Sequence, residues 1–283
     1  GDYIPGFDST DKKTITVRHL LTHTSGLTEW YPMYYLADNK QKTYKLIESL
    51  PLKYPVGAER HYSDLGFVLL GQIVEEVSGL PFEVFLQKEL FGPLHMNKTG
   101  FNPLKINKNK KIAATSHGNP YEKRMVHDST LGFKVKEIDP ESWNGWRTYT
   151  LQGEVNDGNA WYANGGISGA AGLFSNIKDI QKLLDQLMGK SKYPQIISKK
   201  TIELFLTRDS FDNGLGWVMD PENSVIKSGP DGSYGHTGFT GTSISVIPSN
   251  DISIILLINR QNKGLLSSGN YYNVSPLRQR IFE

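Results

Sequence analysis

Apolar positions follow a helical spacing through the first hundred residues and a strand-like alternation from residue 213 onward. The clearest helical pattern covers residues 65–78 (LGFVLLGQIVEEVS), and Gly79 supplies its stop. A short helix is expected to begin at Thr16 and to end at Gly26. Further helices are expected over 39–50, 81–91, 179–188 and 199–206. Strands are expected over 215–219, 224–227, 241–248 and 252–259, with 248–251 as a hairpin turn.

This order of elements, helices first and an antiparallel meander last, predicts an α+β fold rather than alternating βαβ units. We expect an antiparallel sheet flanked by helices, together with a mainly helical subdomain. Residues 1–283 are expected to form one domain, with a helical and loop-rich part at about 18–212 and a sheet part at about 213–260 that includes the chain termini. Within the first part, residues 100–165 have weak periodicity and predict long loops and short strands.

Composition narrows the classes of function. The 31 Lys and Arg residues against 29 Asp and Glu give a net charge of +2, which argues against a nucleic-acid partner. The basic run at 105–111 (KINKNKK) is interpreted as a solvated loop. The chain has no cysteine, which excludes disulfides and thiol nucleophiles. The longest apolar run, 252–258, is too short to span a membrane.

The remaining candidates for chemistry are hydroxyl groups, histidines and glycine-rich loops. No Gly-x-Ser-x-Gly motif occurs, so a nucleophile elbow is not supported. His19 and His23 stand four apart on an expected helix, which is metal-ligand spacing, but Leu20 stands where a zincin has its Glu. We expect no metal and no organic cofactor. A metal hydrolase using His19 and His23 is a rival hypothesis that elemental analysis for zinc would test.

Three segments together carry a family resemblance, and they are His23-Thr24-Ser25-Gly26-Leu27, Tyr62-Ser63-Asp64 and His236-Thr237-Gly238-Phe239. In this order the chain resembles the serine β-lactamase-like superfamily, which includes class C β-lactamases, penicillin-binding-protein-like D-alanyl-D-alanine carboxypeptidases and bacterial esterases. The resemblance covers residues 3–283. It implies acyl-enzyme hydrolysis of an ester, amide, β-lactam or D-amino-acid peptide. It also favours an extracytoplasmic location, either periplasmic, secreted or at the cell surface.

The resemblance implies roles for the second segment. Tyr62 matches the tyrosine of the Tyr-x-Asn motif and would shuttle a proton, which requires a nearby positive charge to lower its pKa from about 10. Asp64 stands where the family usually has Asn. An Asn both accepts and donates hydrogen bonds, whereas an ionised Asp only accepts them. Trp161, with Tyr162 beside it, is a candidate for lining the cleft.

The third segment matches the Lys-Thr-Gly strand motif, with His236 in place of Lys. Thr237 would face the substrate, Gly238 would let the acyl group approach, and the Phe239 backbone N–H would be an oxyanion-hole donor. Because neutral imidazole lacks a permanent charge, His236 weakens recognition of a substrate carboxylate. The substitution therefore favours an esterase or a D-peptidase over a β-lactamase.

The family's nucleophile belongs to a Ser-x-x-Lys motif that precedes the first segment by a few tens of residues. Three such tetrads begin at Ser9, Ser175 and Ser224, and none opens an apolar helix. Ser9 lies in a polar loop, Ser175 at a structural helix start, and Ser224 in an expected strand. We therefore expect the nucleophilic Ser and its Lys upstream of Gly1, and a fold incomplete at both ends. A complementing N-terminal segment is an expected partner beside a small-molecule or peptide substrate. The rival is an inactive member that binds peptidoglycan-like or peptide ligands.

Overall fold

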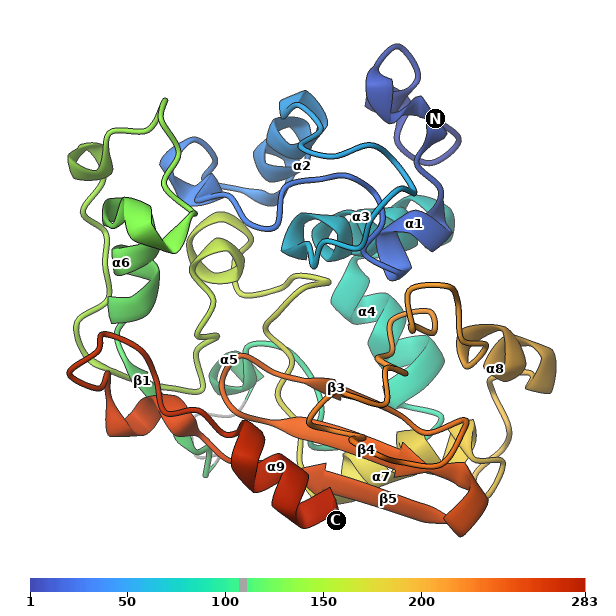
Figure 1. The fold of residues 1–283 in the computed structure, drawn as a ribbon. Coiled ribbons are helices and arrows are strands. Elements are labelled where there is room, and N and C mark those ends of the chain that lie inside the picture. The colour runs from blue at the N-terminus through green and yellow to red at the C-terminus, as the bar shows by residue number, and fades with distance from the viewer. Residues whose placement is uncertain (107–110, 283) are drawn as a thin grey trace. The chain divides into compact units, whose positions relative to one another are not determined.

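The computed structural model describes residues 1–106 and 111–282, so most of the basic run at 105–111 lies outside the described residues. Figure 1 shows the helices and strands along the chain. The chain forms two compact units. The first contains residues 1–85, 101–173 and 262–270, and the second contains residues 86–100, 174–261 and 271–283. The expected division at residues 212 and 213 stays a prediction.

The first unit is built mainly from helices. Its sheet pairs β1 (Ala114–His117) with β2 (Thr150–Gln152) in antiparallel fashion. The helix α4 (Phe82–Leu86) continues as a π-helical turn, Gln87–Phe91, into the second unit. The other helices are α1 (Val17–Leu21), α2 (Lys40–Ser49), α3 (Asp64–Ser78), α5 (Pro103–Ile106) and α6 (Pro120–His127).

Helix α3 forms the centre of the first unit. It begins after Ser63, whose hydroxyl accepts the N–H of Gly66, and it ends at Gly79 in the left-handed conformation (φ 66°). Its buried face packs in a cluster with residues of α1, α2 and the N-terminal segment. The buried members are Ile4, Phe7, Leu20, Leu27, Met33, Ile47, Leu65, Val68 and Leu69.

The second unit holds a three-stranded antiparallel sheet in the order β3 (Tyr234–Thr237), β4 (Ser243–Ile247) and β5 (Ile252–Leu256). The register pairs Thr237 with Ser243 at one end of the ladder. The helices of this unit are α7 (Ile177–Leu187), α8 (Lys199–Phe205) and α9 (Ser275–Phe282). Its core comprises Leu184, Met219, Tyr234 and Val246.

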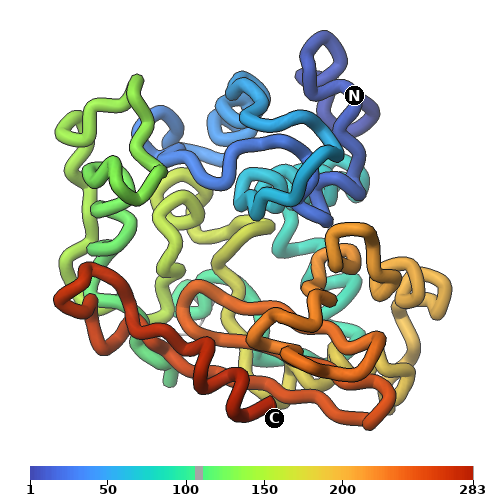
Figure 2. Tube along the Cα trace, viewed as in Figure 1, coloured from blue at the N-terminus to red at the C-terminus, as the bar shows by residue number. Residues whose placement is uncertain are grey.

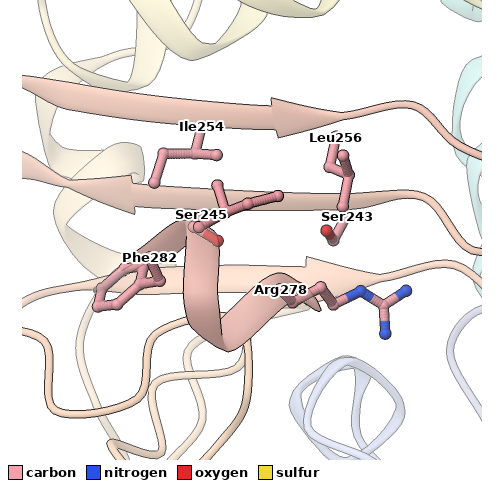
Figure 3. A pocket seen from close by; sticks show the side chains of 7 residues that line it. Ser243, Ser245, Ile254, Leu256, Arg278 and Phe282 are labelled. Carbon is pink, nitrogen blue, oxygen red and sulfur yellow. The ribbon is translucent and has the colours of Figure 1, made fainter. Parts of the chain in front are cut away.

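Helix α9 packs against the sheet, and a cavity of about 10 Å³ lies between them (Figure 3). Ser243 and Ser245 line this cavity from β4, and Arg278 lines it from α9. The Arg278 guanidinium donates to the carbonyls of Gly241 and Thr242 at 3.0 and 3.1 Å. The C-terminal helix therefore braces the loop between β3 and β4.

Most expected helices are confirmed to within a few residues, and so are the last hairpin and the α+β class. The strands expected at 215–219 and 224–227 are wrong. Residues 215–219 make only isolated bridges at Val218, and 224–227 form turns in which the Asn223 side chain accepts the N–H of Val225. Burial of apolar side chains in an irregular segment imitates a strand pattern.

Two further expectations need correction in the first unit. Helix α1 ends at Leu21, because His23 takes a left-handed backbone conformation (φ 58°) that an α-helix cannot continue through. Gly26 instead lies at φ 78°, where an added Cβ would stand 2.2 Å from the Tyr54 carbonyl oxygen. Helix α6 also lies inside the stretch expected to be loops.

Among the described residues no single helix is long and apolar enough to cross a membrane. Only α3 taken together with the helix Phe82–Phe91, which is bent relative to it, passes that test of length and composition.

Candidate active site

Tyr62 and Ser63 lead into α3, whose first residue is Asp64, and residues 62–64 are called the Tyr62 turn below. Figure 2 traces the chain from its N-terminus in blue to its C-terminus in red. The Ser63 hydroxyl donates to the Thr28 carbonyl at 2.7 Å, and the Asp64 N–H donates to the Glu29 carbonyl at 3.0 Å. The segment after α1 therefore acts as the frame for the turn. The Ser63 N–H also donates to His23 Nδ1 at 3.0 Å, which gives a structural reason for the first sequence segment, 23–27, to accompany the second.

The Tyr62 side chain is 47% exposed, and one face of its ring lies against His23, with ring centroids 4.3 Å apart. Partial burial raises the pKa of Tyr62 to about 12; Asp64 adds to the rise and Arg60 opposes it. Tyr62 is thus held as a phenol at neutral pH. The family role requires a lowered pKa, so it needs a cation that lowers the pKa of Tyr62 more than Arg60 does.

Burial, with a further contribution from the Asp157 carboxylate, raises the pKa of Asp64 to about 7. Near neutral pH a large fraction of this carboxyl is therefore protonated. A protonated carboxyl has one donor and one acceptor oxygen, as an Asn amide has a donor and an acceptor. When protonated, Asp64 can therefore make the same kinds of hydrogen bond as the family's Asn, and it differs from Asn mainly by its charge when ionised.

Asp157 and Glu122 are acidic neighbours that sequence reasoning missed. The Asp157 carboxylate accepts the N–H of Ala160 at 2.7 Å, and Glu122 accepts the N–H of Gly158 at 2.9 Å. Burial raises the pKa of both groups, that of Glu122 to about 8 with help from Asp157. No local motif marks these residues, because α6 and the loop at 157 meet only in the folded chain.

Trp161 lies half-buried in the π-helical turn Asn159–Ala163, in the same unit as Tyr62. The Arg147 guanidinium stands 4.6 Å from the Trp161 ring centroid and 5.4 Å from that of Tyr162. Arg147 is buried, and it donates to the Asn119 side chain and to the Asn156 carbonyl. This arginine therefore fixes the orientation of the Trp161 ring.

In the second unit, His236 and Thr237 end β3, and Gly238 and Phe239 follow the strand. Thr237 is exposed, and its strand neighbour His236 turns Nδ1 to the Thr237 carbonyl at 2.9 Å. The Gly238 N–H donates to the Thr242 carbonyl at 2.8 Å, and an added Cβ would meet the Thr242 hydroxyl at 2.3 Å. Gly238 therefore keeps this corner tight and uncovered.

Phe239 is 52% exposed and is held by Arg260, which donates to its carbonyl at 2.9 Å. The same guanidinium stands 5.1 Å from the Phe239 ring centroid. Tyr271 packs edge-on against this ring at 6.1 Å. These contacts anchor the backbone whose N–H is the candidate oxyanion-hole donor, and Arg260 is a further residue that sequence reasoning missed.

The predicted site residues fall into two sets. Tyr62, Asp64 and Trp161 belong to the first unit, and His236 to Phe239 belong to the second. Tyr62 and Asp64 are neighbours at the start of α3, and His236 to Phe239 follow one another at the end of β3. Across residues 1–106 and 111–282, no group of three or more His, Cys, Asp or Glu side chains has a metal-binding arrangement. The Nδ1 atoms of His19 and His23 accept the backbone N–H groups of Thr16 and Ser63, respectively.

Comparison with known proteins gives a family match over almost the whole chain. The family described as Beta-lactamase matches residues 1–275. N-acetylmuramyl-L-alanine amidase of Bacillus subtilis (strain 168) is 35% identical, over 96% of this chain and 63% of its own length. A protein of Escherichia coli (strain K12), provisionally named D-alanyl-D-alanine carboxypeptidase, is 34% identical over 91% of this chain and 61% of its own length. The chain thus spans about three fifths of the length of these relatives.

Solved structures share the fold at lower identity. A penicillin-binding protein homologue from Caulobacter crescentus superposes with a TM-score of 0.65 and 19% identity, covering 100% of this chain and 73% of its own. A class C beta-lactamase superposes with a TM-score of 0.63 and 18% identity, covering 99% and 70%. At these identities the likeness supports the arrangement of helices and sheet alone.

Proposed function

The chain belongs to the Beta-lactamase family, and from this premise we propose that it serves acyl-enzyme hydrolysis of an ester, amide, β-lactam or D-amino-acid peptide. Within that range we favour an amide bond in a D-amino-acid peptide. The two curated relatives are named as an amidase and a carboxypeptidase, and both names describe cleavage of amide bonds. The replacement of Lys by His236 supports the same choice over a β-lactam.

The observation that carries this proposal is the Tyr62–Asp64 turn at the start of α3. A phenol and a carboxyl with a pKa of about 7 stand two residues apart on a rigid turn. Tyr62 gives a proton to the leaving nitrogen and takes one from the nucleophile, and Asp64 positions the cation that makes the second transfer possible. The phenol is half-exposed, so a substrate has access to it.

The second set of residues supplies substrate contacts in this proposal. Thr237 faces the substrate, Gly238 leaves room for the acyl group, and the Phe239 N–H stabilises the oxyanion. His236 meets the substrate carboxylate as a neutral hydrogen-bond donor. Trp161 lines the cleft with an aromatic face held by Arg147.

We further propose that the nucleophilic Ser and its Lys lie upstream of Gly1, as a complementing segment. Ser175 is engaged with the Thr99 hydroxyl at 2.7 Å, and Thr99 in turn donates to Asp179. Ser224 lies in a turn. An extracytoplasmic location belongs to the same proposal.

The second candidate is a family member that binds peptidoglycan-like peptides without cleaving them. The raised pKa of Tyr62 favours it specifically, because a phenol with a pKa of about 12 is a poor proton acceptor at neutral pH. In this case Asp64 and His236 serve binding only.

Intact-mass measurement after exposure to an activated fluorophosphonate or a chromogenic cephalosporin separates the two candidates. The chain 1–283 is compared with a protein that includes any residues preceding Gly1 in its gene. We expect an adduct on the longer protein and none on the chain alone. An adduct on the chain alone contradicts the upstream nucleophile, and a longer protein that binds a D-alanyl-D-alanine peptide without acylation supports the binder.

A further inference from the structure

His23 has an unusual backbone for its residue type. It lies at φ 58°, in the left-handed region, which a non-glycine residue adopts only at a cost in free energy. Its side chain is only 5% exposed. The surrounding contacts must offset this cost, so the position of the ring is strongly determined.

His23 contacts three consecutive residues, 61–63, at and just before the Tyr62 turn. Its carbonyl accepts the His61 N–H at 2.8 Å, and its Nδ1 accepts the Ser63 N–H at 3.0 Å. Between these two bonds the imidazole packs against the Tyr62 ring, with an interplanar angle of 34°. One residue therefore fixes the backbone on both sides of Tyr62 as well as one face of its phenol.

A second aromatic ring also packs on the imidazole. Phe67, one turn into α3, lies 4.9 Å from the imidazole centroid at an interplanar angle of 27°. The imidazole is thus in contact with Tyr62 and with Phe67. Because Nδ1 receives a backbone N–H, it must present a lone pair, which places the proton of the neutral ring on Nε2.

His19, four residues earlier, shows that the arrangement is specific to His23. Its Nδ1 accepts the Thr16 N–H at 3.2 Å, and Thr16 accepts the His19 N–H at the same distance, which closes a capping box on α1. Both bonds stay within α1 and its cap. His19 therefore serves the start of its own helix.

From this geometry we propose that His23 is a positioning residue that holds the Tyr62 phenol in one orientation for proton transfer. The proposal rests on the proposed role of Tyr62. The imidazole restricts the phenol to one side of the turn, and the Nδ1 bond keeps Ser63 in place as the cap of α3. A loose phenol would spend little time at the reacting atoms, so the clamp acts on turnover more than on substrate binding.

His23→Asn is the main test variant, because Asn tolerates the left-handed backbone but removes the ring. His19→Asn is the matched control. In chain 1–283 with ring-labelled tyrosine, we expect the Tyr62 ring signals to move toward those of a solvent-exposed tyrosine in His23→Asn and to stay in place in His19→Asn. Unchanged Tyr62 signals in folded His23→Asn overturn the proposal. If that variant does not fold, Phe67→Leu removes the outer ring alone and is expected to move the same signals by a smaller amount; unchanged signals there overturn the proposal as well.

The kinetic readout uses the protein with any residues that precede Gly1. His23→Asn is expected to lower kcat by about 10- to 100-fold with KM within twofold, because misplacement costs the chemical step. Equal effects on kcat and KM, or a rise in KM with kcat unchanged, contradict a positioning role. If the wild-type protein shows no hydrolysis while the Tyr62 signals respond as expected, the proposed function fails and the clamp stands.

Discussion

The turn that carries Tyr62 and the strand end that carries Thr237 are fixed in different ways. The turn donates hydrogen bonds to His23, Thr28 and Glu29, and the Tyr62 ring packs on the buried His23 imidazole. The strand end has one neighbouring strand, β4, and two arginines that hold its loop through backbone carbonyls, Arg260 and Arg278. The first region is therefore held by the segment that follows α1 and by one buried imidazole. The second is held by one strand neighbour and two arginine side chains.

The two regions also differ in charge. The turn includes Asp64, and the Asp157 carboxyl acts on both Tyr62 and Asp64; the pKa values of both carboxyl groups are raised. The strand end carries His236 with Arg260 and Arg278 behind it. The negative charge near Tyr62 favours the binding of a cation. The positive charge near the strand end favours an anionic group and a developing oxyanion. Each region can therefore be perturbed separately.

The largest effect is expected from Tyr62→Phe, which removes the phenolic proton and keeps the ring stack. In the protein with any preceding residues, kcat/KM should fall by about 100- to 10,000-fold, the usual contribution of a general acid or base. The melting temperature should change little. Tyr272→Phe is the matched control, because Tyr272 is 51% exposed and lies outside both regions. Equal activity of the two variants would exclude a proton-transfer role for Tyr62.

The next largest effects are expected from truncating a core side chain in either unit, which should lower the free energy of unfolding. Leu69 and Leu184 are fully buried, one behind the turn and one behind the sheet. Leu69→Ala and Leu184→Ala should each lower the free energy of unfolding by about 2 to 5 kcal/mol. Denaturant melts with ring-labelled tyrosine compare the two variants. Only Leu69→Ala should also disturb the Tyr62 signals, and an equal disturbance by Leu184→Ala would contradict the separation of the two regions.

Asp64→Asn should act through pH. The folded pKa of Asp64 is about 7 and its unfolded value is near 4, so the folded state binds more protons between these values and loses stability as pH rises through them. Asn removes that loss. The variant should therefore exceed the wild type in stability by about 1 to 3 kcal/mol at pH 8 and match it below about pH 4. A difference that does not vary with pH would show that the Asp64 carboxyl is not destabilised by its surroundings.

The smallest effect is expected from His236→Lys at the strand end. A permanent ammonium should lower KM for a substrate with a free carboxylate by about fivefold, roughly 1 kcal/mol, and the gain should shrink at high salt. A substrate whose carboxylate is blocked as an amide provides the control. If the blocked substrate gains as much, the effect does not arise from charge pairing, and the assignment of His236 to carboxylate recognition fails.

The predictable part of the fold follows from local signals. The length and spacing of α3, its cap at Ser63 and its stop at Gly79 are all encoded in neighbouring residues. The hairpin at 248–251 is encoded by Pro248 and by Asp251 in the left-handed region. Segments 215–219 and 224–227 were expected as strands because apolar content alone does not reveal whether a partner strand is present. Pairing depends on tertiary contacts.

The candidate site divides in the same way. Tyr62, Asp64 and the 236–239 segment could be chosen from motif order. Asp157, Glu122 and Arg147 could not, because their importance comes from contacts between segments tens of residues apart, such as Glu122 with Gly158. His23 was visible in sequence but suggested metal spacing. Its contacts with residues 61–63 depend on the left-handed backbone of His23, which cannot be predicted from the spacing of residues in the sequence.

Site-resolved titration of the Tyr62 phenol tests the central claim most directly, namely that the acidic turn keeps Tyr62 protonated until a cation joins it. Carbon-13 at the phenolic carbon reports ionisation of that one group in chain 1–283. We predict an apparent pKa of about 12, above the ordinary value of about 10, and a lower value when residues preceding Gly1 that contain a Ser-x-x-Lys motif are included. A value at or below 10 in chain 1–283 would contradict the account.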